Sequence, residues 1–166
     1  DRGVGRRDWA IAGAIALGGL LLYVATLCPT IYVEDSAEFW TAAAIFGVPH
    51  PPGYPLWTLL GGLFVRALPL GDVGFRSNVF SAVCGAGAAG ALWILARRLG
   101  ADRVAALAAT ICFAVGRTVW SQGLAAEVHA LNALLLALAL LATFEAERAP
   151  TARSFAAAGL ALGLAL

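Results

Sequence analysis

Three carboxylates and one of the two histidines stand close together in one polar stretch of the chain. Glu34, Asp35, Glu38 and His50 fall within 17 residues, directly after a long apolar run. Ionisable groups beside a bilayer are costly and are mostly kept where they take part in function. Carboxylates and imidazole are also the side chains that most often move protons in catalysis. This stretch is therefore the first candidate for a catalytic loop.

A structural explanation of the same carboxylates stays open. Asp35 and Glu38 have the spacing of a capping box, in which Asp35 caps a helix and Glu38 bonds back to it. Such a cap is worth about 1 kcal/mol. In the catalytic interpretation, Asp35 or Glu38 is the general base that deprotonates an acceptor hydroxyl. Spacing alone does not decide between the capping and the catalytic interpretation. Glu34, which precedes Asp35, is placed in the substrate-binding part of the loop.

His50 opens a proline-rich segment that reads His-Pro-Pro-Gly-Tyr-Pro. A rigid turn here would position His50 and Tyr54 for substrate contacts, and the backbone of Gly53 could approach a ligand closely. The same prolines and glycine are also what ends one helix and starts the next.

Two further polar groups begin apolar segments. Arg76 and Asn78 are both placed in the substrate-binding part of the site. The Arg76 guanidinium matches phosphate oxygens, or it extends from a span toward the interface. Glu127 and His129 are predicted to contact substrate behind the first loop, to bind a metal with the acidic loop, or to form a polar helix start. Because no His-x-x-x-His spacing is present, we expect no metal cofactor, with a divalent ion as the lesser alternative.

Composition indicates an all-α membrane protein. Of the 166 residues, 61% are hydrophobic and 13% are charged, and the mean hydropathy is +0.83. A soluble domain does not have this composition. A net charge of +1 without a basic block gives no reason to expect a nucleic-acid partner. The three cysteines, Cys28, Cys84 and Cys112, form no disulfide or metal-binding pattern.

Apolar segments predict the helices. We expect spans over about 9–28, 79–96, 104–120 and 124–144, and an incomplete one over 154–166. The last 13 residues cannot cross a hydrocarbon core of about 30 Å. We therefore expect residues 1–166 to be the N-terminal part of a longer transmembrane domain. Two short helices, about 35–47 and 54–70, are expected between the first two spans.

The arginines decide the role of segment 54–70. If it does not cross, eight arginines fall on the cytoplasmic side and three on the other; if it crosses, the split is six against five. The positive-inside rule favours the first topology. Residues 54–70 are then interfacial, and the acidic loop, Arg76, Glu127 and His129 share the non-cytoplasmic side.

Taken together, the motifs resemble one family. They are Pro29-Thr30 followed by Asp35-Ser36 and Glu38-Phe39, then His-Pro-Pro-Gly-Tyr-Pro-Leu from His50, then Phe-Arg-x-Asn-x-x-Ser-Ala from Phe75. This combination resembles the DUF2723 family, related to the TMEM260 type of protein O-mannosyltransferases. The segment from Glu127 to Asn132 resembles a later Glu-Val-Tyr-x-Leu-Asn element, with His129 in place of tyrosine.

The resemblance implies a fold and a chemistry. It implies a GT-C glycosyltransferase module, with juxtamembrane helices and a catalytic acid in the first external loop, and a sugar donor carried on polyprenyl phosphate. Asp35 is then the catalytic carboxylate, Glu38 and His50 line the same site, and Arg76 meets the lipid phosphate. The role of His129 stays open.

These observations predict a membrane hexosyltransferase. It would move a mannose-like sugar from polyprenyl phosphate to a protein or glycan hydroxyl, at the outer face of a bacterial inner membrane. Such transfer needs a base, a cation for the departing phosphate and an apolar groove. The alternative is a transporter or lipid-binding protein with an acidic ion or substrate site, which would show discontinuous helices and internal repeats.

Overall fold

The computed structural model describes residues 4–30 and 35–165. Every regular element in these residues is an α-helix. In chain order they are α1 Arg6–Ala25, α2 Ser36–Ile45, α3 Pro55–Ala67, α4 Val73–Arg98, α5 Arg103–Val115, α6 Arg117–Leu124, α7 Val128–Arg148 and α8 Ala152–Ala165.

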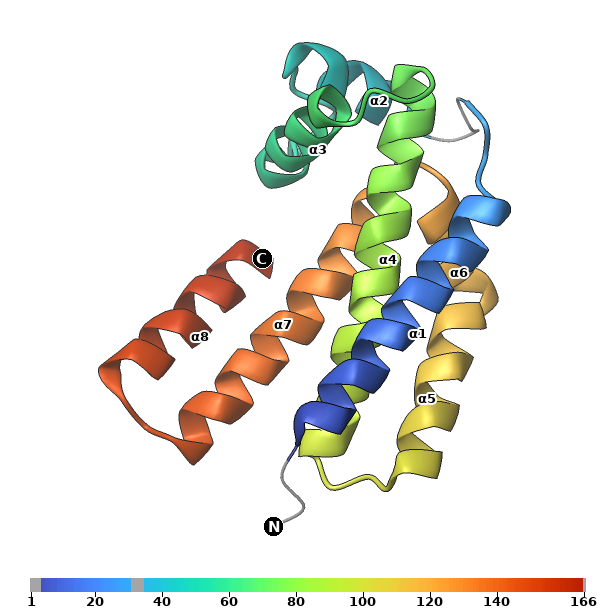
Figure 1. Ribbon diagram of the computed structural model, residues 1–166. Coiled ribbons are helices and arrows are strands. Elements are labelled where there is room, and N and C mark those ends of the chain that lie inside the picture. The colour runs from blue at the N-terminus through green and yellow to red at the C-terminus, as the bar shows by residue number, and fades with distance from the viewer. Residues whose placement is uncertain (1–3, 31–34, 166) are drawn as a thin grey trace.

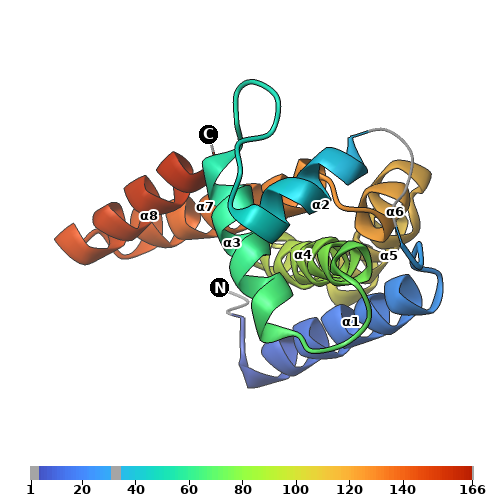
Figure 2. The same ribbon diagram turned by 90° about the horizontal axis from the view of Figure 1, so that it is seen from above.

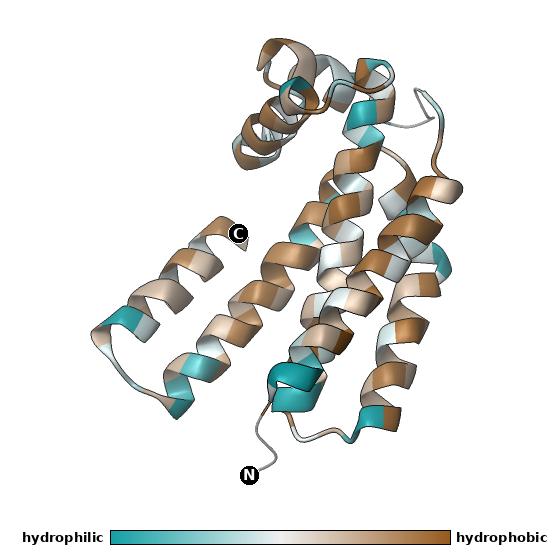
Figure 3. Ribbon diagram, in the orientation of Figure 1, coloured by the Kyte–Doolittle hydropathy of each residue, from teal (hydrophilic) through white to brown (hydrophobic). Residues whose placement is uncertain are grey.

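Three of these helices, α1, α4 and α7, are long and apolar enough to cross a membrane. The bent pair formed by α5 and α6 passes the same test as a unit, and α8 is a shorter apolar helix. Apolar residues run along the long helices, and hydrophilic residues gather toward their ends (Figure 3). The chain is therefore an all-α membrane protein, as its composition predicts.

Helix α4 forms the centre of the bundle. Seen from above, α1, α7 and the α5–α6 pair surround it, and α2 and α3 lie beside its first turns (Figure 2). Its glycines permit this close packing, because a Cβ at Gly90 would lie 3.0 Å from the Ala12 carbonyl oxygen. Helix α1 packs against Gly90 and helix α7 against Gly87.

The end of the bundle far from α2 and α3 is held by an ion cluster. The Asp8 carboxylate lies 3.1 Å from Nε of Arg97 and 3.4 Å from Nε of Arg103. The Trp93 indole donates to the backbone carbonyl of Asp8 at 3.0 Å. Asp8 and Arg97 are both buried. This cluster fixes the start of α1 to the corner between α4 and α5.

The span predicted over 104–120 is not one continuous helix, because the chain breaks at Gly116. Helices α5 and α6 meet there at a bend of 54°, and Gly116 has an extended ψ of 132°. The buried Tyr23 hydroxyl donates to the Ala114 carbonyl oxygen at 2.7 Å, next to the break. A hydrogen bond from α1 thus satisfies a backbone group beside the place where the helix is interrupted.

Helix α4 begins six residues before the span predicted at 79. Asp72 caps it, since its side chain accepts from the Phe75 amide at 2.7 Å. Arg76 and Asn78 therefore belong to the first turns of α4. Helix α3, at 13 residues, is not among the span-length helices, and with α2 it lies across one end of the bundle (Figure 1).

Candidate functional site

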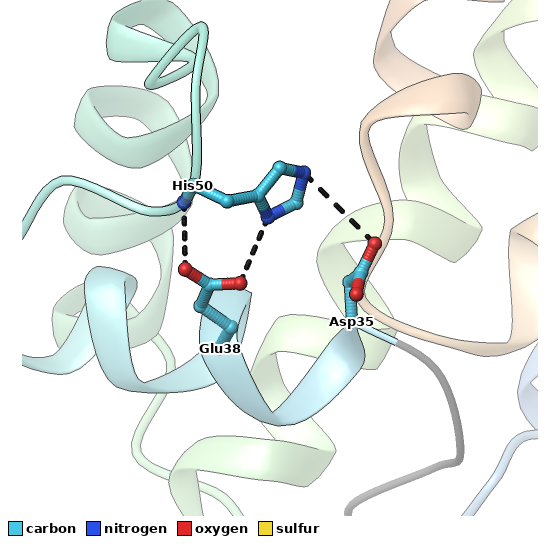
Figure 4. A group of neighbouring side chains, drawn as sticks. All are labelled: Asp35, Glu38 and His50. Atoms are coloured by element: carbon cyan, nitrogen blue, oxygen red, sulfur yellow. Dashed lines mark hydrogen bonds and ion pairs between the residues drawn. The ribbon is translucent and has the colours of Figure 1, made fainter.

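The Glu38 carboxylate is bonded to His50 and not to the start of its own helix. Its Oε1 accepts from the His50 backbone amide at 2.6 Å, and its Oε2 lies 2.8 Å from His50 Nδ1 (Figure 4). Asp35 occupies the N-cap position of α2, yet its side chain makes no capping hydrogen bond within the described residues. The capping-box interpretation is therefore wrong, because both carboxylates face the loop instead.

The chain turns back after α2 and brings His50 over this helix. Phe46 ends α2 in the left-handed region, with φ 52°. The Gly53 amide then donates to the His50 carbonyl at 2.9 Å, and Gly53 has φ 94°, which favours glycine. Pro55 starts α3 at its first position. The proline-rich segment thus forms a tight turn and also starts the next helix.

His50 lies between Asp35 and the aromatic rings of Phe39 and Tyr54. Its Nε2 lies 3.9 Å from Oδ2 of Asp35. Its ring meets Phe39 and Tyr54 edge-on, with centroid distances of 5.7 and 5.5 Å. These contacts leave the His50 ring partly exposed between the two carboxylates.

The hydrogen bond between Glu38 and His50 shifts the pKa of both side chains. The hydrogen bond from the His50 ring lowers the pKa of Glu38, although partial desolvation opposes this. The same bond with Glu38 raises the pKa of His50, and the charges of Glu38, Asp35 and Glu127 add to the effect. Glu38 is therefore ionised at neutral pH, and His50 titrates above its ordinary range.

Asp35, Glu38 and His50 could also reach a single metal ion. One ligand atom from each lies within 4.8 Å of the others. However, both oxygens of Glu38 already accept hydrogen bonds from His50. A metal would have to displace these bonds, so the observed arrangement suits proton chemistry better than a three-ligand metal site.

Glu127 lies beneath this loop, in the N-cap position of α7. Its carbonyl oxygen accepts from the Trp57 indole at 3.1 Å, and its amide lies 3.4 Å from Oγ of Ser81. The residue is buried. These contacts connect α3, α4 and the start of α7 directly below His50, so Glu127 belongs to the same end of the molecule as the acidic loop.

Asn78 is fully buried and connects three parts of the chain. Its amide nitrogen donates to the carbonyl oxygens of Cys28 and Thr30, at 2.9 and 2.8 Å. Its side-chain oxygen accepts from the Ala126 amide at 2.8 Å. Asn78 thereby fixes the chain after α1 and the chain before α7 against α4.

The Arg76 guanidinium lies in the turn between α3 and α4. It donates to the carbonyl oxygens of Val65, Leu70 and Gly71, at distances of 3.3, 3.0 and 2.8 Å. Arg76 therefore holds the end of α3 to the start of α4. These contacts put it at the same end of the bundle as the acidic loop, but its guanidinium is directed to backbone oxygens.

An apolar hollow of about 320 Å³ opens beside the proline-rich turn. It lies between α3, α7 and α8, and its lining includes Pro52, Tyr54, Trp57, Leu131, Leu135 and Leu164. One polar side chain of α7, Asn132, also lines it. Asn132 is absent from the predicted site, although its position in the Glu127–Asn132 motif was a signal that could have found it.

The structure brings together four of the eight predicted site residues that it describes. Asp35, Glu38 and His50 form one cluster, and Tyr54 packs on its histidine. Among the described residues, His129 is exposed on α7 and is not part of that cluster. Glu34 lies outside the described residues.

The sequence of this chain matches a known family model. The model describes the N-terminal domain of the protein O-mannosyl-transferase TMEM260, and it matches residues 35–166. The chain belongs to the TMEM260 N-terminal domain family. The match begins at Asp35, so it includes both described carboxylates of the loop, the proline-rich turn and the start of α7.

Two curated relatives of this TMEM260-family chain carry the same name. The protein O-mannosyl-transferase TMEM260 of Mus musculus is 36% identical over 149 residues, which are 89% of this chain and 21% of the relative. The Dictyostelium discoideum protein is 27% identical over 120 residues, or 71% of this chain and 15% of that relative. The chain thus spans about a fifth or less of each relative. No solved structure matches the chain.

Proposed function

We propose that this chain carries the donor-side catalytic region of a membrane glycosyltransferase that transfers mannose, or a similar sugar, to hydroxyl groups of proteins. The donor is the sugar linked to polyprenyl phosphate, and the acceptor is a serine or threonine hydroxyl. The reaction takes place on the non-cytoplasmic side of the membrane, which for a bacterial cell is the outer face of the inner membrane. The names of the two relatives, both protein O-mannosyl-transferases, support the class of reaction.

One observation carries the proposal: the carboxylate–histidine cluster lies next to an apolar hollow. His50 belongs to the cluster, and Pro52 and Tyr54 of the same turn line the hollow. A polyprenyl chain needs an apolar groove, and its sugar must reach a base that takes the acceptor proton. The turn from His50 to Tyr54 provides both within a few residues.

In the proposed reaction the acceptor oxygen attacks the anomeric carbon of the sugar. The bond between that carbon and the phosphate oxygen breaks, and polyprenyl phosphate leaves with its electrons. Attack from the side opposite to the phosphate inverts the anomeric configuration. Asp35 is the carboxylate on which transfer depends, and no metal takes part. Arg76, which the sequence suggests for the phosphate, lies at the same end of the bundle, but its guanidinium is bonded to three backbone carbonyl oxygens. The phosphate is therefore not assigned to it.

The transporter alternative has one structural feature in its favour, the bend at Gly116. Discontinuous helices are typical of transporter binding sites. Here, however, the carbonyl beside the break is bonded to Tyr23 of α1. The ionisable cluster lies on α2 and the proline-rich turn instead. The bend therefore does not place a charged site inside the bundle, and the glycosyltransferase proposal is preferred.

The proposal is tested with the full-length protein in detergent and a panel of polyprenyl-phosphate sugars. We expect consumption of the mannosyl donor to require an acceptor polypeptide and to release polyprenyl phosphate. A protein that binds these lipids and turns none of them over would contradict the proposal.

A further inference from the structure

Glu38 holds the His50 ring in one tautomer. An ionised carboxylate only accepts hydrogen bonds, so Nδ1 of His50, at 2.8 Å from Oε2, must carry a proton. The second oxygen of Glu38 accepts from the His50 backbone amide at 2.6 Å. Both the position and the tautomer of the ring are thereby set. When His50 is neutral, the lone pair able to accept a proton is on Nε2.

Nε2 of His50 faces the Asp35 carboxylate across a gap. The separation of 3.9 Å from Asp35 Oδ2 is too long for a direct hydrogen bond. A hydroxyl oxygen about 2.8 Å from each of these atoms would fit between them. Both side chains are partly exposed, at 36% for His50 and 60% for Asp35, so the gap is accessible from outside.

We propose that His50 is the catalytic base of the transfer and takes the acceptor hydroxyl proton at Nε2, with Glu38 as its positioning residue. This inference rests on the proposed function and names the base of that reaction. The O–H bond breaks and its proton goes to Nε2, while the oxygen lone pair forms the bond to the anomeric carbon. Asp35 contacts the same hydroxyl and then faces the imidazolium that has formed. In this arrangement a carboxylate, Glu38, orients a histidine base through a hydrogen bond to its Nδ1.

Histidine suits this role better than a carboxylate. A general base works best when its pKa lies near the working pH, and the reference values are about 6.5 for imidazole and about 4 for carboxyl groups. The described charged groups that face His50 are Asp35 and Glu38 of α2 and Glu127 at the start of α7. All three are acidic, so they stabilise the imidazolium that proton transfer creates.

The test is the pH dependence of kcat/KM for the full-length enzyme, from about pH 5 to 9, with its mannosyl donor. For the unmodified enzyme we expect kcat/KM to rise with pH, with a midpoint above 6.5, because the base must be neutral. His50→Asn should lower kcat by about 10² to 10⁴-fold and remove this rise, with the donor KM within about twofold. Glu38→Gln should move the midpoint to lower pH, because it removes the charge that favours the imidazolium.

Glu145→Gln is the matched control. Glu145 pairs with Arg98 at 2.8 Å, near the far end of α7, and its replacement should leave the midpoint unchanged. Melting temperatures in detergent show whether each variant is folded. If His50→Asn does not fold, the Glu38→Gln midpoint decides the question.

Two results would overturn the inference while the proposed function stands. One is a His50→Asn enzyme within about fivefold of the unmodified rate, given the 10² to 10⁴-fold contribution expected of a general base. The other is a midpoint that does not move in Glu38→Gln. Either result would leave Asp35 as the base. If the unmodified enzyme transfers no sugar from any donor, the proposed function fails, and this inference fails with it.

Discussion

The Glu38 carboxylate accepts two hydrogen bonds from His50, one from its backbone amide at 2.6 Å and one from its ring Nδ1 at 2.8 Å. The two residues are twelve positions apart, and this contact closes the loop between α2 and α3. It decides the orientation of the histidine toward Asp35. The geometry of the candidate site therefore depends on one carboxylate–histidine contact.

The first prediction concerns the pH range in which this contact is strongest. The pKa of Glu38 is lowered, so its contribution to stability is present above its unfolded value of about 4.5 and is lost as pH falls through the lower, folded value. The pKa of His50 is raised, so its contribution is complete below 6.5 and is lost as pH rises through the higher, folded value. Hydrogen-exchange protection of the His50 amide should be greatest between these limits. Protection that stays constant from acid to alkaline pH would show that the contact contributes nothing to local stability.

The second prediction concerns Arg76. A lysine carries its three donors on one nitrogen, so it cannot reach the three carbonyl oxygens that the separate nitrogens of the guanidinium reach. Arg76→Lys should therefore lower the melting temperature in detergent, because the carbonyls of Val65, Leu70 and Gly71 lose their donor. We expect the KM for the polyprenyl-phosphate donor to stay within about twofold, since this guanidinium binds backbone oxygens. A tenfold rise in that KM with an unchanged melting temperature would indicate that Arg76 binds the phosphate.

The third prediction concerns Asn78. Asn78→Asp keeps the shape of the side chain but replaces the amide donor with an oxygen that faces the carbonyls of Cys28 and Thr30. Loss of these two part-buried hydrogen bonds should cost about 1–3 kcal/mol. Thermal unfolding in detergent measures the loss. A variant as stable as the unmodified protein would mean that these two bonds do not hold the chain after α1 to α4.

The fourth prediction concerns the other end of the bundle. Asp8→Asn removes the negative partner of Arg97 and Arg103. Breaking a buried ion pair costs about 3–5 kcal/mol, and because Arg103 is half exposed we expect a value near the lower limit. The unfolding temperature should fall, while the pH dependence of transfer stays the same. A change in that pH dependence would argue against separate roles for the two ends.

Length and apolar composition were sufficient to predict the long helices. The apolar runs near the N-terminus and after residue 124 become α1 and α7 with shifts of a few residues. The early start of α4 depends on the Asp72 cap, a local signal that the apolar window over 79–96 did not include. The break at Gly116 was missed because a single glycine does not by itself end a helix. The hydroxyl of Tyr23 that bonds the carbonyl beside the break comes from a distant helix.

The candidate site was predictable in its residues but not in its contacts. Residue types alone placed Asp35, Glu38 and His50 in one loop, because ionisable groups are rare in so apolar a chain. Their spacing allowed a capping box equally well, and only the fold of the turn shows that Glu38 bonds to His50. The bonds of Asn78 connect residues about 50 positions apart, and no local pattern contains that information.

Transfer by the Asp35→Asn variant of the full-length protein tests the central claim most directly. The rate of mannosyl transfer from polyprenyl phosphate to a polypeptide acceptor would be measured beside the melting temperature in detergent. Because Asp35 belongs to the group that binds the reacting hydroxyl and stabilises the charge formed on proton transfer, we predict a rate loss of at least about 100-fold with unchanged melting. A folded variant that transfers sugar within about threefold of the unmodified rate would contradict the account, because a site centred on this loop cannot lose that carboxylate without effect.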